Sequence, residues 1–347
     1  MKALPLEATH RKRGARFGPV GDWRLPLDYG DPDGEQRGVR TAVGVIDASA
    51  KGKMRVEGPD RLAFLDGLLT NDLKTLSPGG GLYAATLDHR GRVHGDMVVY
   101  ALEDHYLIAT EPEAGDRVLA YLNRLLVSDD VTMTDVTDAF AVFGVYGPRS
   151  GEVVRGVAGT LPPTNAYAHV GGPGGRLVAR SPAFGGEGYE LWAPAAEADG
   201  LLHGLLDHGA VPFGHTAAEA HRIEAGRPKF PLDMNEDTIA VEARLESAIS
   251  MTKGCYVGQE VVSRATYVGH VNRTLVGLEI DGTAVPPGGA GIAANGKPVG
   301  HVTSVARSAT LGKTVGLGYI RREASGPGTE VTVDGAPARV AALPFVR

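Results

Sequence analysis

The hydrophobic positions along the chain change their period several times, and each period predicts an element. In the first part, Leu62, Leu65 and Leu69 recur at helical spacing, whereas the neighbouring apolar runs have the length and bounding turns of strands. The resulting order, β-α-β-β-β-α-β, is typical of a split βαβ unit. The predicted elements lie at 54–58, 60–69, 82–87, 93–102, 106–110, 118–126 and 131–136.

A similar order of elements recurs in the next stretch, although the sequence itself does not repeat. Two further helices are expected after it, at 216–225 and at 240–249. The sequence therefore predicts an α+β protein with two units of the split βαβ type. The elements of the second unit are strands at 139–146, 166–170, 176–180, 189–193 and 211–213, with helices at 149–157 and 195–206.

After residue 271 short β-type runs alternate with turn residues. Asn295-Gly296 and Asp334-Gly335 are hairpin signals, because both positions of a type I′ turn need a positive φ. We expect a small all-β barrel or sandwich there. The expected division is an N-terminal segment (1–50) that packs with the second unit, a first α+β unit (51–138), a second α+β unit (139–270) and a C-terminal β barrel (271–347).

Composition and charge narrow the classes of protein. Glycine (49) and proline (22) together make up about a fifth of the 347 residues, against ~12% in average usage, which fits a fold with many turns. The net charge of −6 argues against a generic nucleic-acid coat. No apolar run approaches the ~18 residues of a membrane span, so we expect no membrane partner. Residues 1–30 lack the apolar core of a secretory signal.

The single cysteine, Cys255, limits the chemistry further. One thiol excludes an intramolecular disulfide, a Cys₄ zinc site and a self-held iron–sulfur cluster, and it fits a reducing cytoplasm. The histidines show no metal-ligand spacing, so we expect no metal site. Cys255 is either an inert, buried small hydrophobe or a reactive thiol. In the second case Lys253 and the flanking glycine N–H groups would lower its pKa.

The residues around this cysteine carry a resemblance to a known family. They read Lys253-Gly254-Cys255-Tyr256-Val257-Gly258-Gln259-Glu260, which resembles the signature of the YgfZ-type folate-binding proteins. These resemble the glycine-cleavage T-protein (aminomethyltransferase) in fold. The T-protein typically has Asp where this chain has Cys255, so the motif favours the YgfZ branch. The similarity covers about residues 10–280, including the stretches at 13–29, 58–60, 64–65, 70–72, 222–226 and 233–238.

The resemblance implies a three-domain, T-protein-like arrangement around a central channel that binds tetrahydrofolate or a derivative. Glu190, preceded by Tyr189, matches the superfamily's pterin-binding carboxylate, which accepts two N–H groups of the pterin edge. Asp96 matches the T-protein aspartate that faces the reactive folate nitrogens. Without the resemblance, Glu190 reads as a solvent-exposed glutamate at a strand end and Asp96 as a strand aspartate paired with an arginine.

Cations suit the anionic glutamate tail of a folate, and Arg222, Arg227 and Arg264 are the candidates. Ordinary surface cations are the alternative for Arg227 and Arg264. The chain also departs from the T-protein. It reads Ala50-Lys51-Gly52 in place of His-Met-Gly, and Thr110-Glu111-Pro112-Glu113 where the T-protein usually has an asparagine. These changes weaken the case for aminomethyl transfer and leave folate binding through Glu190 open.

Three functions follow from these features. The favoured one is a folate-binding accessory protein for iron–sulfur cluster assembly or repair in client enzymes, including tRNA-modifying ones, with Cys255 and Lys253 as its reactive pair. The alternative is a tetrahydrofolate-dependent aminomethyltransferase or related one-carbon transferase in which Asp96 orients the folate. An RNA-binding module that takes tRNA is the weakest, because the chain is acidic.

Overall fold

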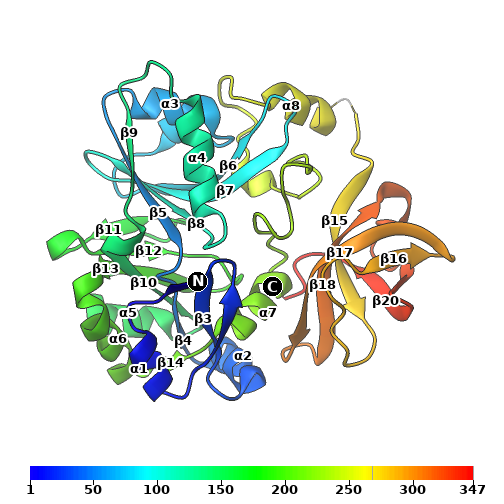
Figure 1. Ribbon diagram of the computed structural model, residues 1–347, viewed down its shortest axis with the longest axis horizontal. Coiled ribbons are helices and arrows are strands. Elements are labelled where there is room, and N and C mark those ends of the chain that lie inside the picture. The colour runs from blue at the N-terminus through cyan, green and yellow to red at the C-terminus, as the bar shows by residue number, and fades with distance from the viewer. Residues whose placement is uncertain (268, 347) are drawn as a thin grey trace.

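The first α+β unit holds a five-stranded antiparallel sheet in the order β6-β7-β8-β5-β9 (Figure 1). The computed structural model describes residues 1–267 and 269–346. Helices α3 and α4 cover one face of this sheet, and every element predicted between residues 54 and 136 is found. The elements are β5 (Gly52–Glu57), α3 (Arg61–Leu68), β6 (Gly81–Leu87), β7 (Val93–Ala101), β8 (Tyr106–Thr110), α4 (Gly115–Leu125) and β9 (Thr132–Asp135).

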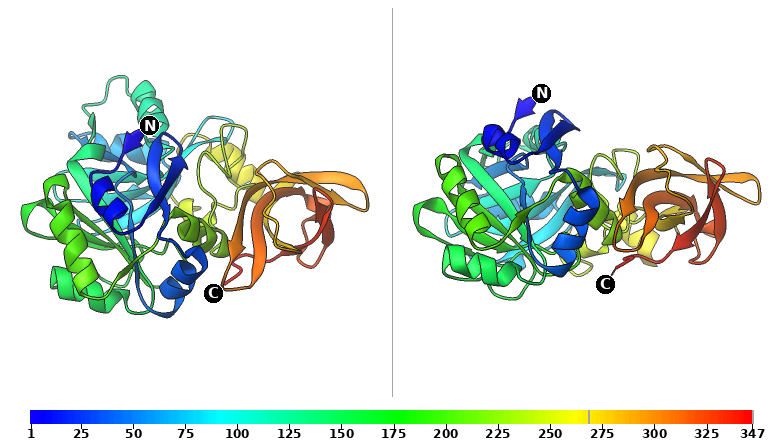
Figure 2. Two further views of the ribbon diagram at one scale, coloured as in Figure 1. Left: turned by 60° about the horizontal axis from the view of Figure 1, so that its bottom comes forward. Right: turned by 90° about the horizontal axis from the view of Figure 1, so that it is seen from below.

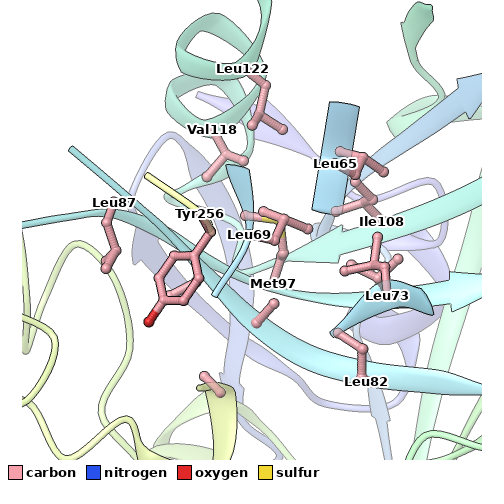
Figure 3. Packing of buried hydrophobic residues seen from close by; sticks show 14 of the residues in the cluster. Leu65, Leu69, Leu73, Leu82, Leu87, Met97, Ile108, Val118, Leu122 and Tyr256 are labelled. Carbon is pink, nitrogen blue, oxygen red and sulfur yellow. The ribbon is translucent and has the colours of Figure 1, made fainter. Parts of the chain in front are cut away.

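The core of this unit forms where apolar faces of the two helices meet the sheet (Figure 3). Leu65 of α3 and Leu122 of α4 are fully buried against Ile108 of β8. Burial of one such side chain stabilises the fold by about 1.5–3 kcal/mol. Tyr256, from the segment between α7 and α8, enters the same core (Figure 3), so the signature motif packs against the first unit.

The second unit holds a six-stranded sheet in the order β11-β12-β13-β10-β4-β14, with α5 and α6 packed against it. Strand β4 comes from the N-terminal segment, and the sequence pattern did not predict a strand there. Residues before it form a separate three-stranded sheet, β1-β3-β2. The elements of this lobe are β1 (Lys2–Ala3), α1 (Glu7–Lys12), β2 (Arg16–Val20), β3 (Trp23–Asp28), α2 (Pro32–Thr41), β4 (Gly44–Asp47), β10 (Phe140–Tyr146), α5 (Ser150–Ala158), β11 (His169–Gly171), β12 (Leu177–Arg180), β13 (Gly188–Pro194), α6 (Ala198–Asp207), β14 (Val211–Pro212) and α7 (His215–Glu224).

The C-terminal strands close into a barrel in the order β15-β18-β17-β16-β19-β20, beside the α+β lobes with α7 between them (Figure 2). Asn295 and Gly296 have φ of +50° and +74°, and Asp334 and Gly335 have +46° and +86°. Both predicted hairpins are thus present, and the α+β fold with a C-terminal barrel is confirmed. The strands are β15 (Arg273–Ile280), β16 (Gly291–Ala294), β17 (Lys297–Ser308), β18 (Lys313–Arg321), β19 (Glu330–Val333) and β20 (Ala336–Ala341).

The connection between α7 and the barrel differs from the prediction. The helix expected at 240–249 is wrong: the segment is a series of turns ending in a short 3₁₀ helix, and Arg244 has φ of +58°, which an α-helix cannot include. Helix α8 (Gln259–Tyr267) was not predicted. Within the described residues, no helix is both long and apolar enough to cross a membrane. The 3₁₀ helices are η1 (Leu73–Thr75), η2 (Thr137–Ala139), η3 (Pro173–Gly175), η4 (Ala195–Glu197), η5 (Glu246–Ala248) and η6 (Arg322–Ala324).

Candidate functional site

A cavity lies where the two large sheets meet helix α7. Asp96 of β7, Glu190 of β13 and Arg222 of α7 all line it, so elements far apart in sequence meet in one place. The space between its lining atoms, including the part open to solvent, is about 1120 Å³. A cavity of this kind, with apolar walls and a few converging polar groups, is the usual form of a small-molecule site.

Glu190 presents the clearest ligand-binding feature in this cavity. Its side chain is only 3% exposed, and its Oε1 accepts a hydrogen bond of 2.5 Å from Lys51 Nζ. Its Oε2 is also buried and has no hydrogen-bond partner within 3.5 Å among the described residues, although the Tyr100 hydroxyl lies near this carboxylate in the cavity wall. A buried carboxylate oxygen without a partner is costly, so native structures rarely keep one without a reason. The free oxygen is therefore a ready acceptor for a ligand N–H group.

The neighbouring Tyr189 does not share this position, which corrects its expected cofactor-binding role. Successive side chains of a strand point to opposite faces, so Glu190 and Tyr189 of β13 cannot both reach the cavity. Tyr189 packs into the core beneath α5 and α6, and its hydroxyl donates to Glu187 Oε1 at 2.7 Å. It is absent from the cavity lining.

Asp96 is held by two hydrogen bonds in the cavity wall. Tyr83 Oη donates to its Oδ2 at 2.7 Å, and the backbone N–H of Phe230 donates to its Oδ1 at 3.2 Å. Burial is the largest influence and raises the pKa of Asp96 to about 6, assisted by the charge of Glu111 and opposed by the two hydrogen bonds. The carboxylate is therefore mostly ionised at neutral pH, but can take up a proton within reach of physiological values.

Arg222 lines the cavity, yet its guanidinium is fully used by the protein. Its nitrogens donate to Glu219, Asp233 and Ser304, and to the backbone carbonyl of Arg227. These bonds occupy all five N–H donors of the side chain. The expectation that Arg222 binds the folate tail is corrected accordingly: it joins α7 to the barrel strand β17.

The two remaining arginine candidates lie in different surroundings. Arg227 lines the cavity, donates to Tyr167 Oη at 2.8 Å, and sits 5.5 Å from the ring centroid of Tyr83. Arg264 is exposed on α8 and is not part of the lining. Only Arg227 of this pair is positioned to meet a ligand in the cavity.

The signature motif lies outside the cavity. Cys255 is exposed in the loop before α8, so its interpretation as a buried hydrophobe is wrong. Lys253 points elsewhere: its Nζ contacts the carboxylate of Asp66 at 3.1 Å and three backbone carbonyls. An ammonium has three N–H donors, so none is left to stabilise a thiolate at Cys255. The carbonyls belong to Asp66, Leu69 and Asn71, at 2.6–2.9 Å.

The other motif residues anchor this loop to the first unit. Gly258 has φ of +86°, and a Cβ there would lie 2.6 Å from the carbonyl oxygen of Asp88, so glycine is required. Gly254 faces open space and is under no such constraint. Gln259 and Glu260 begin α8. The motif therefore fixes its loop against the first unit and leaves the Cys255 thiol exposed.

Several cavity residues were not among the predicted site residues. Lys51, Tyr83 and Glu111 come from three different segments, and no local pattern links them. A signal existed for Lys51, because it replaces an apolar residue of the T-protein pattern just before a strand. The other polar lining residues that were not predicted are Asp47, Tyr100, Thr110, Tyr146, Tyr167, Ser181, His215, Glu219 and Lys229.

The fold and cavity define a class: three-part α+β proteins in which two large sheets and a barrel-linked helix line a cavity. Residues 6–253 match the GCVT N-terminal domain, and residues 273–347 match the glycine cleavage T-protein C-terminal barrel domain. The chain belongs to this family.

Full-length relatives support the same assignment. The aminomethyltransferase of Rubrobacter xylanophilus is 33% identical over 355 residues, covering 100% of this chain and 95% of that protein. The aminomethyltransferase of Bacillus subtilis is 31% identical over 346 residues, covering 96% and 95%. The crystal structure of the glycine cleavage system aminomethyltransferase T from Bartonella henselae matches with a TM-score of 0.92 at 26% identity, covering 99% and 98%. The superfamily part of the resemblance is thereby confirmed, whereas the YgfZ branch stays a prediction.

Proposed function

We propose that the protein is a tetrahydrofolate-dependent one-carbon transferase of the aminomethyltransferase type. The relatives named aminomethyltransferase align with the whole chain, barrel included. This support favours the enzymatic alternative over the iron–sulfur accessory role that the motif first indicated.

One observation carries the proposal: two buried carboxylates from different sheets, Asp96 and Glu190, face one cavity. A reduced pterin carries a ring N–H and an amino group on one edge, and a carboxylate accepts both. Glu190, with its unpartnered Oε2, suits that edge. Asp96 would then face the nitrogens that carry the one-carbon unit.

The chemistry that this chain supplies is orientation and charge. Tyr83 fixes one oxygen of Asp96, and the Phe230 N–H fixes the other, so the carboxylate does not need to reorganise during reaction. When ionised, Asp96 stabilises positive charge on a reacting amine and can accept its proton. A folate would supply the nitrogen nucleophile, and the walls would exclude water and hold the reactants together.

Titration calorimetry with tetrahydrofolate tests the binding part of this proposal. The wild type is expected to bind, and Glu190→Gln is expected to weaken binding by about tenfold or more, because an amide N–H replaces a charged acceptor. Glu152→Gln, on the exposed surface of α5, is the matched control and should bind as the wild type does. Absence of binding to the wild type would rule out the folate site.

A glycine-cleavage assay reconstituted with its partner proteins tests the reaction. Ammonia release and methylene-folate formation are expected with the wild type, and both should disappear with Asp96→Asn. Folate binding without any turnover would instead identify a binding protein that uses the same cavity.

The exposed thiol of Cys255 supports a second candidate, the folate-binding accessory protein for iron–sulfur enzymes. In this version the thiol meets a client or assembly protein outside the cavity, without help from Lys253. Cys255→Ala in a deletion strain tests it: normal iron–sulfur enzyme activities would exclude a role for the thiol. A tRNA partner and a cytoplasmic location stay predictions.

A further inference from the structure

The function proposed above gives no role to one cationic side chain in the cavity. Lys51 lines the cavity wall and contacts Glu190, where the T-protein pattern has a methionine. This inference rests on the proposed function. We propose that Lys51 Nζ donates a hydrogen bond to the C4 carbonyl of the pterin, so that Lys51 and Glu190 together select a 2-amino-4-oxo ring.

The position of Lys51 is fixed at its backbone. Its N–H donates to the Ala48 carbonyl at 3.0 Å, and its own carbonyl accepts from Lys53 Nζ at 3.0 Å. Lys53 is fully buried and also donates to the carbonyls of Ser49 and Thr137, at 2.7 and 2.8 Å. These buried hydrogen bonds fix the backbone of the loop before β5, and they therefore fix the position from which the Lys51 side chain extends.

The ammonium of Lys51 is charged and has donors to spare. Burial opposes its charge, but Glu190 and Glu111 outweigh burial and raise the pKa of Lys51 above its ordinary value. Of its three N–H donors, one bonds to Glu190 Oε1, and no other described residue accepts from Nζ. The side chain is 19% exposed, and it lines the cavity. Two N–H donors are thus available to a ligand.

The chemistry of the pyrimidine edge of a pterin fits this pair of groups. Along that edge, an amino donor, a ring N–H donor and a carbonyl acceptor follow one another. The two oxygens of Glu190 match the two donors, and only its Oε1 is flanked by a cation. With the ring N–H on Oε1 and the amino group on Oε2, the C4 carbonyl follows on the Oε1 side, where Lys51 Nζ lies. A methionine at this position would offer the carbonyl no donor.

A cycle of one protein change and one ligand change tests this assignment. The ligands are a tetrahydropterin and its 4-thioxo analogue, which keeps the ring N–H but replaces the C4 oxygen with the weaker acceptor sulfur. In the wild type this replacement is expected to weaken binding about tenfold, because a charge-assisted hydrogen bond is lost. In Lys51→Met it should change affinity less than twofold. Lys297→Met, on the exposed surface of the barrel, is the matched control and should keep the wild-type ratio.

The outcomes separate the two proposals. If both proteins bind the ligands and the ratio of the two Kd values is the same in the wild type and in Lys51→Met, Lys51 does not bond to the C4 carbonyl. That result would overturn this inference and would not contradict the folate site. Failure of the wild type to bind any tetrahydropterin would overturn both. If Lys51→Met does not fold, the wild type alone decides by isotope-edited infrared spectroscopy. The C4 carbonyl stretch of the bound ligand is expected below its value in water, and an equal or higher value would overturn the assignment.

Discussion

The buried charged side chains differ in how completely neighbouring groups satisfy them. Lys253 and Arg222 donate all their N–H groups to protein oxygens, so they stabilise the fold and have no donor left for a ligand. Glu190 keeps a free oxygen, and Asp96 has two hydrogen bonds but a raised pKa. Ionisable groups that a fold leaves incompletely matched are the ones expected to meet a ligand.

Asp96 should cost the protein stability at neutral pH. Its folded-state pKa of about 6 lies above its ordinary value of 3.8, so the folded state loses stability as pH rises between these values. Asp96→Asn removes this penalty and can keep both hydrogen bonds, because the Tyr83 hydroxyl can also accept. We expect a gain on the order of 2 kcal/mol at pH 7.5 and little gain at pH 4, measured by urea unfolding. Asp207→Asn, at an exposed site, is the control, and a gain independent of pH would contradict the prediction.

The signature motif should contribute to stability through Lys253 and not through Cys255. Lys253→Met leaves Asp66 without its buried partner and frees three backbone carbonyls, so we expect a loss of about 3 kcal/mol in the free energy of unfolding. Cys255→Ala changes an exposed residue and should stay within ~0.5 kcal/mol of the wild type. Chemical denaturation compares the two, and equal effects would contradict the structural role of Lys253.

Helix α7 connects the lobe that contains the N-terminal elements with the barrel. It packs on α2, on β3 and on the barrel strands β17 and β18. Two side chains of α7 make polar contacts with β17: Arg222 donates to Ser304 Oγ, and Glu224 accepts from Ser308 Oγ. The same helix contributes Glu219 to the cavity. The barrel thus supports one wall of the ligand site, although it supplies no described residue to the lining.

Loss of Arg222 should loosen this junction. Arg222→Met leaves Asp233 without its cationic partner and Glu219 with Lys229 as its remaining close cation, and breaking a buried charge pair costs roughly 3–5 kcal/mol. Hydrogen exchange is expected to increase in α7 and β17 before it increases in β10 and β13. The control is Arg149→Met, whose partner Glu152 is exposed. Exchange that increases uniformly would show that the contact is not local to this junction.

At the scale of the whole molecule, the sequence predicts helices and strands better than it predicts the side-chain contacts between them. The strands and helices of residues 54–136 follow from local periods, because side-chain alternation reports directly on one buried face. Asp96 and Glu190 were reached through the family resemblance. The Lys51–Glu190 contact joins residues 139 positions apart, one in the loop before β5 and one in β13, and no local pattern encodes it. Tyr189 was assigned wrongly because a shift of one residue along a strand changes the face.

Ligand binding should stabilise the molecule unevenly, because the cavity walls come from both sheets and α7. At a tetrahydrofolate concentration 100 times its Kd, binding adds about 2.7 kcal/mol to the free energy of unfolding. Hydrogen-exchange protection is expected in β7, β13 and α7, which carry Asp96, Glu190 and Glu219, and not in the outer barrel strands β16 and β19. Glu190→Gln at the same concentration should lose most of this protection. Protection confined to the barrel would mean that the folate binds outside this cavity, since no described residue of the barrel strands lines it.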